Sequence, residues 1–91
     1  MIVRILGEGQ FRVDEAATVE LQKLDADLEV AVEHDDQQAL AAALGALLAR
    51  ARQGVALAPD SLEPSDVIIP HEGATVAEVR KMLTDEGLIP G

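Results

Sequence analysis

The pattern of apolar and polar residues at the start of the chain indicates two short strands. Residues 1–6 are mostly apolar, residues 10–13 alternate polar with apolar, and glycines flank Glu8 between them. Because glycine adopts positive φ without steric cost, we predict a β-hairpin with the loop Gly7-Glu8-Gly9, Gly9 left-handed and Leu6 opposite Gln10. A hairpin alone is only marginally stable in water, so a third strand and a helical cover are expected.

The predicted register separates the side chains of the hairpin into two faces. One face carries Val3, Ile5, Phe11 and Val13, and the other carries Ile2, Arg4, Leu6 and Arg12. A slip by one residue would place Arg4 among the apolar side chains. Phe11 is the one aromatic residue of the chain, and we expect it to anchor the core.

A helical period follows the hairpin. Asp14 suits the N-cap and Glu15 the first turn, where a carboxylate favours the helix dipole, and the helix is predicted to run to about residue 34. Apolar residues recur at steps of four and three on the face expected to be buried: Ala17, Leu21, Leu24, Leu28 and Val32. A polar stripe adjoins this face: Thr18, Gln22, Asp25, Glu29 and Glu33.

A second helix is predicted after a tight break at residues 34–36. Asp35 or Asp36 would cap it, it would continue to about Gln53, and Gly54 suits the C′ position. Its buried face is expected to hold Leu40, Leu44, Leu47, Leu48 and Ala51. Most other positions between residues 39 and 51 are alanine, the best helix former. The two helices should therefore form a long antiparallel hairpin.

The last third of the chain predicts a loop, a strand and a helix. Residues 54–66 are rich in Pro, Asp and Ser, which is typical of a surface loop, and residues 67–69 form the third strand, placed at an edge or a strand end by Pro70. Thr75 and Glu78 match a capping box that opens a helix. Its buried side chains are expected to be Val76, Val79, Met82 and Leu83. Gly87 suits a Schellman C′ residue, with Leu88 touching Leu83 and Pro90 blocking further helix.

The element order is therefore ββααβα, and it predicts a small α+β domain that spans residues 1–91 as a single unit. An N-terminal β-hairpin and a third strand carry a long helical hairpin and a C-terminal helix. A mostly helical alternative, in which the strands form only a small ribbon beside the helical hairpin, stays open. A chain of 91 residues has room for one core.

Charge and composition narrow the function classes. The chain has 17 acidic and seven basic residues, a net charge of −10 that repels nucleic-acid phosphates. It has no cysteine, no signal peptide pattern at its start, and no stretch near the roughly 20 apolar residues of a membrane span. We expect a cytoplasmic protein without nucleic-acid binding and without direct membrane insertion.

No arrangement of residues predicts catalysis or a cofactor. His34 and His71 lack a metal-ligand spacing, and no serine is set beside a histidine and a carboxylate. The loop around Glu8 lacks the lysine of a phosphate-binding loop. Asp25 and Asp27 would point about 200° apart on a helix, so they are interpreted as solvated surface acids. We predict no catalytic residue, no metal and no cofactor.

One apolar strip on the first predicted helix lies outside the core pattern. Val19, Ala26 and Val30 fall about 180° from the centre of the buried face, with Lys23 and Glu33 beside them. Scattered apolar residues are common on protein surfaces and account for the strip without any function. The functional interpretation is a shallow seam that docks a partner helix or a second copy of the chain.

Three stretches carry a resemblance to a known family. They are Met1-Ile2-Val3-Arg4-Ile5-Leu6-Gly7-Glu8-Gly9-Gln10-Phe11, Pro64-Ser65-Asp66-Val67-Ile68-Ile69-Pro70, and Asp85-Glu86-Gly87-Leu88-Ile89-Pro90-Gly91 after a helix with Glu78-Val79-Arg80. In these stretches the chain resembles the PspA-associated family (PspAA), whose members accompany phage-shock protein A in envelope-stress systems.

The resemblance implies a non-enzymatic adaptor for a PspA-like coiled-coil protein, membrane-associated only through that partner. An acidic domain without a catalytic constellation agrees with such a role, because an acidic face can meet a basic stretch of a partner. The alternative is a small ligand-binding or enzyme-regulating domain that uses the groove between hairpin and helices.

Overall fold

A mixed β-sheet forms one layer of the protein, as seen in a computed structural model that describes residues 1–83 and 87–89. In these residues the sheet is four-stranded, in the order β3-β2-β1-β4. Its strands are β1 (Ile2–Ile5), β2 (Gly9–Arg12), β3 (Val55–Ala56) and β4 (Val67–Ile69). β2 pairs antiparallel with β1 and with β3, whereas β4 pairs parallel with β1. The three predicted strands are confirmed, and β4 lies at the edge that Pro70 indicated.

The predicted register of the hairpin is wrong by two residues. Ile5, not Leu6, lies at the end of the ladder, opposite Gly9, and Arg4 lies opposite Gln10. The loop is closed by the Glu8 N–H donating to the Ile5 carbonyl at 3.0 Å, while Leu6 donates its N–H to Ile69 in β4 at 3.1 Å. A shift of two residues keeps every side chain on its predicted face, because side chains alternate with a period of two.

The core lies on the helical side of the sheet, and Phe11 is not its anchor. Val3 and Ile5 are fully buried, whereas Phe11 is half-buried and packs at the margin of the core. The largest fully buried side chains include Leu21, Leu28, Leu40, Leu44, Leu47, Leu48 and Ile69. The predicted buried faces of the two long helices are therefore confirmed, except that Leu24 is half-buried and Ala31 joins the core.

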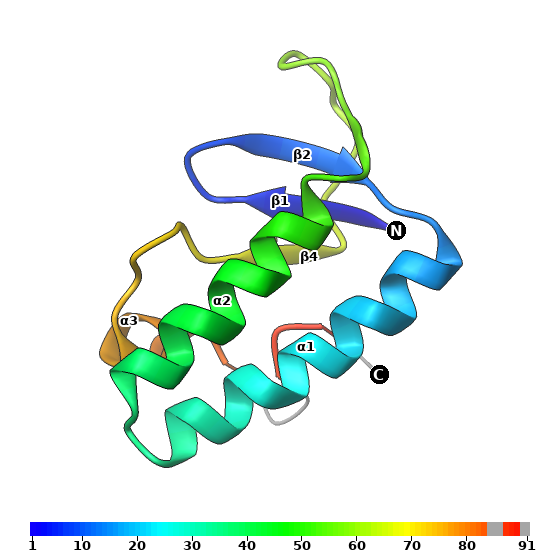
Figure 1. The fold of residues 1–91 in the computed structure, drawn as a ribbon. Coiled ribbons are helices and arrows are strands. Elements are labelled where there is room, and N and C mark those ends of the chain that lie inside the picture. Colours follow the sequence, from blue (N-terminus) through cyan, green and yellow to red (C-terminus); the bar gives the residue numbers. More distant parts are fainter. Residues whose placement is uncertain (84–86, 90–91) are drawn as a thin grey trace.

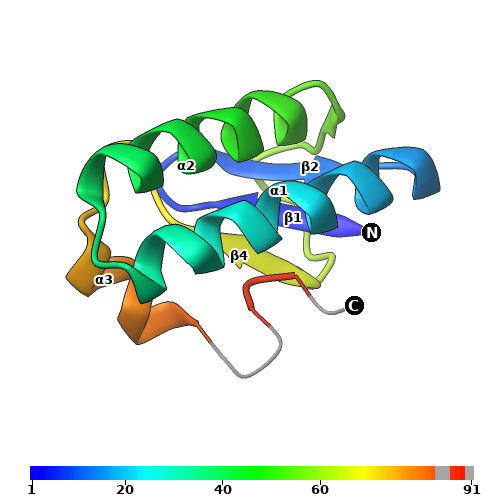
Figure 2. The ribbon, with the colours of Figure 1, turned by 60° about the horizontal axis from the view of Figure 1, so that its bottom comes forward.

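Two long helices cover one face of the sheet, side by side and antiparallel (Figures 1 and 2). α1 (Glu15–Glu33) is capped by Asp14, whose Oδ1 accepts the Ala17 N–H at 2.8 Å. α2 (Gln37–Ala51) is capped by Asp36, whose Oδ1 accepts the Ala39 N–H at 3.0 Å. The α+β order ββααβα is confirmed, and the mostly helical alternative is wrong because the sheet supplies the surface on which both helices pack. None of the helices in the described part of the chain is long and apolar enough to cross a membrane.

The third helix, α3 (Val76–Met82), begins as predicted but ends differently. Thr75 and Glu78 form the capping box, with Thr75 Oγ1 accepting the Glu78 N–H at 3.1 Å and Glu78 Oε1 accepting the Thr75 N–H at 3.0 Å. The helix ends at Met82 because Leu83 has an extended backbone with ψ of 138°. The predicted Schellman cap at Gly87 is therefore wrong. The other residues involved in the predicted cap, 84–86 and Pro90, lie outside the described residues.

Glycine is required at position 54 by a close backbone contact and not by the predicted helix cap. α2 ends with Arg52 as its C-cap, and Gly54 has no positive φ. A Cβ atom at Gly54 would lie 2.5 Å from the backbone oxygen of Arg12, so only glycine lets the chain pass this close to β2. The predicted loop over residues 54–66 is consequently wrong at its start, where Val55 and Ala56 pair with β2 as β3. A strand of two residues is too short to show a period in the sequence.

Candidate functional site

The outward face of α1 carries the five residues predicted as an interface. Val19 and Val30 have exposed fractions of 48% and 52%, and Lys23, Ala26 and Glu33 are also exposed. We call these five residues the outer strip of α1. The structure places them together along one side of the helix, opposite the side chains that pack on the sheet.

Acidic side chains border the three apolar residues of the outer strip, Val19, Ala26 and Val30, on both sides. At 100° per residue, Glu15 and Glu33 lie along one border and Glu20 and Asp27 along the other. All four residues are exposed. Glu20 forms an ion pair with Arg50 of α2. An apolar strip between two acidic borders is complementary to an amphipathic helix whose apolar face is flanked by basic residues.

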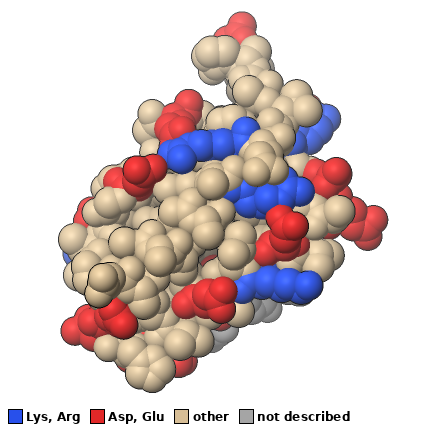
Figure 3. Space-filling view, in the orientation of Figure 1, with Lys and Arg blue, Asp and Glu red and all other residues tan. Residues whose placement is uncertain are grey.

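The outward face of α2 is apolar and uncharged, which was not predicted. Between residues 38 and 49 its exposed residues are Gln38, Ala39, Ala41, Ala42, Ala46 and Ala49. Figure 3 shows the corresponding area without charged side chains over α2. The sequence pattern explained these alanines by helix propensity alone. Their exposure depends on which side of the helix meets the sheet.

The opposite flank of α1 holds a buried carboxylate. Asp25 has an exposed fraction of only 3%, and its two oxygens accept the backbone N–H groups of Leu88 at 3.2 Å and Ile89 at 3.0 Å. The interpretation of Asp25 as a solvated surface acid is therefore wrong. Burial raises the pKa of the Asp25 carboxyl, and the two amide hydrogen bonds oppose this shift. Asp27 is exposed on another side of the helix, as predicted.

Gly87 allows the chain to reach this carboxylate. Its φ is +84°, and a Cβ atom there would lie 2.5 Å from Asp25 Oδ2 and 2.6 Å from Glu29 Oε1. Burial, together with the charges of Asp25 and Glu33, raises the pKa of Glu29. Leu88 and Ile89 are buried against the core. The Asp25 carboxylate thus holds residues 87–89 against α1. In the sequence, the one indication of this contact is that Asp25 adjoins the buried face of the helix.

The residues considered for catalysis and metal binding have structural contacts or remain exposed. His34 Nδ1 lies 3.0 Å from the Val30 carbonyl oxygen, and His71 is exposed. Ser65 Oγ accepts hydrogen bonds from Gln10 Nε2 at 2.7 Å and Arg4 Nε at 3.2 Å. Within residues 1–83 and 87–89, no three His, Asp or Glu side chains gather in a way that could hold a metal ion.

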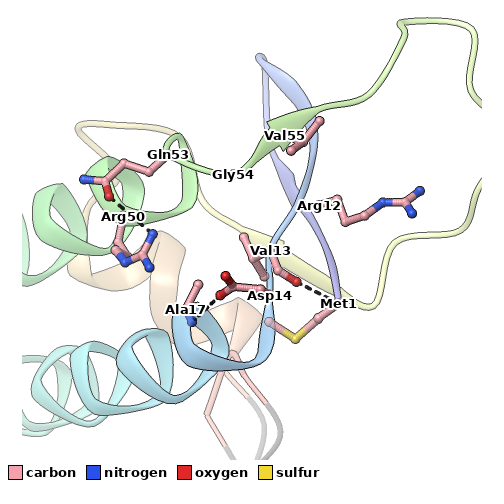
Figure 4. A pocket seen from close by; sticks show the side chains of 9 residues that line it. All are labelled: Met1, Arg12, Val13, Asp14, Ala17, Arg50, Gln53, Gly54 and Val55. Carbon is pink, nitrogen blue, oxygen red and sulfur yellow. Dashed lines mark hydrogen bonds between the residues drawn. The ribbon is translucent and has the colours of Figure 1, made fainter.

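A cavity of about 450 Å³ lies between the hairpin and the two long helices. Its walls come from the end of β2, the first turn of α1, the end of α2 and the start of β3 (Figure 4). Val13, Ala17 and Met1 contribute apolar lining, and Arg50 supplies positive charge. It corresponds to the groove that the alternative hypothesis, a small ligand-binding domain, predicted as the ligand site.

Comparison with known proteins gives one result. No curated protein and no solved structure matches the chain significantly. The family model described as PspA-associated protein (PspAA) matches residues 1–91, which is the whole chain given. The protein therefore belongs to the PspA-associated protein family.

Proposed function

We propose that the protein is a non-enzymatic adaptor that binds a PspA-like coiled-coil protein through the outer strip of α1. The adaptor acts in the envelope stress response, in the cytoplasm, and reaches the membrane through its partner. The observation that carries the proposal is the exposed pair Val19 and Val30 between acidic borders on a helix, in a member of a family described as PspA-associated.

The geometry of the strip supports a helical partner. Val19, Ala26 and Val30 follow each other at steps of seven and four residues, so they form one line along α1. A helix laid against this line would bury its own apolar residues at the matching spacing. Lys23 and Glu33, of opposite charge, would then fix the register of the two helices.

Isothermal titration calorimetry with a purified PspA-like protein tests the proposal. We expect saturable binding at low salt that weakens at moderate salt, because ions screen the attraction between the acidic borders and a basic partner surface. The control is the same titration with the Val19→Asp and Val30→Asp double variant. Absence of binding by the folded wild-type protein at both salt concentrations would refute the adaptor.

Self-association through the same strip is the competing use of this surface. Sedimentation velocity of the wild-type protein and of the double variant distinguishes the two uses. A dimer that dissociates in the double variant, together with no binding of the PspA-like protein, would assign the strip to a second copy of the chain.

The alternative function, a small ligand-binding or enzyme-regulating domain, is favoured by one observation, the cavity between hairpin and helices. Its volume lies in the range of about 300–1,000 Å³ that is usual for ligand sites. The cavity and the outer strip of α1 share no residue, so the two functions can be tested separately.

A further inference from the structure

The cavity described above differs in charge from the rest of the protein. Two of the seven basic residues of the chain, Arg12 and Arg50, line it, whereas Asp14 is the one carboxylate among its described lining residues, in a chain with 17 acidic residues. One oxygen of the Asp14 carboxylate is already used, because Oδ1 caps α1 through the Ala17 N–H. Apart from the second Asp14 oxygen, the lining side chains offer the Arg50 guanidinium donors, the Gln53 amide and apolar carbon atoms.

Arg50 is the residue best placed to contact a ligand. Its side chain has an exposed fraction of 24%, and in Figure 4 it reaches from α2 toward the side of Asp14 and Ala17. Its Nε donates to Glu20 and its Nη1 donates to Gln53 Oε1 at 3.3 Å. A guanidinium group carries five N–H donors, so further donors are available to an oxyanion. Arg12 lines the cavity from β2, but its guanidinium group points away from Arg50 and Asp14 and pairs with Glu63.

Both arginines are held by carboxylates that a ligand can replace. Glu20 pairs with Arg50 and Glu63 pairs with Arg12, and the side chains of these two glutamates have exposed fractions of 58% and 47%. Ion pairs exposed to this extent contribute little to stability. An oxyanion that enters the cavity can therefore exchange with Glu20 at little cost in stability.

We propose that this cavity is a binding site for a small organic oxyanion, such as a carboxylate with a short aliphatic chain. The oxyanion accepts hydrogen bonds from the Arg50 guanidinium group, and the aliphatic chain lies on the partly exposed Met1 side chain, with the buried Val13 and Ala17 beneath it. The proposal is independent of the PspA-like partner, because it uses none of the outer strip of α1.

Butyrate is the probe for the test, followed through the backbone amide signals of Ala17 and Gly54 in two-dimensional NMR spectra. We expect saturable shifts at both signals with butyrate. We expect weaker binding of inorganic phosphate, which lacks the apolar chain, and no binding of n-butylammonium, which has the chain but the opposite charge. Equal affinity for butyrate and butylammonium would overturn the assignment of the site to anions.

Two variants with opposite expected effects on the affinity for butyrate test whether Arg50 contacts the ligand. Arg50→Gln removes the charged donor and is expected to weaken butyrate binding about tenfold or more. Glu20→Gln removes the competing carboxylate and is expected to strengthen binding by about three- to tenfold. A purely structural role of this ion pair would instead make both variants bind more weakly.

Arg52→Gln is the matched control, because Arg52 is also on the last turn of the helical hairpin but pairs with Glu8 and Glu72, away from the cavity. It should leave the affinity for butyrate unchanged. Circular dichroism and thermal unfolding of all three variants confirm that each is folded. Absence of saturable shifts in the wild-type protein, or equal affinity of the wild-type protein and Arg50→Gln, would overturn the proposal.

Discussion

Ile89 donates its backbone N–H to Asp25 Oδ2 at 3.0 Å, although 64 positions separate the two residues in the chain. Leu88 donates to the other oxygen of the same carboxylate. A single buried side chain in the middle of α1 therefore fastens the end of the described chain to the core. This contact is the origin of three predictions on stability.

Replacing Asp25 should destabilise the fold much more than replacing Asp27. Asp25→Asn presents an NH₂ group to one of the two backbone N–H donors and leaves that donor unsatisfied, at a cost of about 1–3 kcal/mol. Asp27 is exposed, so Asp27→Asn should change the free energy of unfolding by less than about 0.5 kcal/mol. Urea denaturation of both variants measures the difference. Equal stabilities would show that the carboxylate does not hold residues 87–89.

Replacing Gly87 tests the close approach to the same carboxylate. Gly87→Ala combines a positive φ with contacts of 2.5 Å and 2.6 Å to Asp25 and Glu29. Gly73→Ala is the matched control, because Gly73 has a φ of +87° but open space around it. Gly73→Ala should cost about 1 kcal/mol, the strain of a positive φ. Gly87→Ala should cost clearly more in the same thermal unfolding measurement, and an equal cost would mean that the contact relaxes freely.

The raised pKa of Asp25 predicts a pH effect of defined sign. A carboxyl group whose pKa is higher in the folded state binds protons more tightly when folded, so its contribution to stability increases as the pH falls through the folded pKa toward the unfolded value of about 3.9. Glu29, whose pKa is also raised, acts in the same direction. Glu8 and Glu78 act in the opposite direction, because hydrogen bonds to Arg52 and Thr75 lower their pKa values.

The difference in the free energy of unfolding between the wild-type protein and Asp25→Asn isolates the pH-dependent contribution of Asp25. The free energy of unfolding of the wild-type protein, relative to that of the variant, should be greater near pH 4 than near pH 7. Urea denaturation at a series of pH values measures it. A relative stability that decreases toward acid pH would mean that the folded pKa of Asp25 is lowered rather than raised.

Charged residues on the outer strip of α1 should leave the fold intact. Val19→Asp and Val30→Asp place carboxylates on positions that are about half exposed, so the pair should change stability by only about 0.5 kcal/mol per site. Association with the partner should be abolished. An unfolded double variant would mean that the strip belongs to the core, and a folded variant with unchanged affinity for partner and self would refute the docking seam.

Chelation of metal ions should not affect folding. The prediction is that excess EDTA leaves the thermal midpoint unchanged, since His34 makes a backbone contact and His71 is exposed. Differential scanning calorimetry with and without EDTA measures the midpoint. A decrease of several degrees would identify His34 and the neighbouring aspartates as ligands.

Features that depend on residues a few positions apart were predictable from the sequence. The caps at Asp14 and Asp36 and the capping box of Thr75 and Glu78 formed as expected, because each connects a side chain to an amide three residues away. The exposure of Val19 and Val30 also followed from the period of the buried face of α1. Their use as an interface stays a prediction.

By itself, the sequence determined the existence of the three helices and of β1, β2 and β4, and which side of each long helix is buried, because helical and strand periods are local properties of the chain. Only the tertiary structure decided the partners of Asp25, the approach of Gly54 to Arg12, the pairing of β3, and the cavity lined by Arg12 and Arg50. Each of these joins segments that are distant in sequence. Their contacts depend on how the helices and strands pack, which no local period specifies.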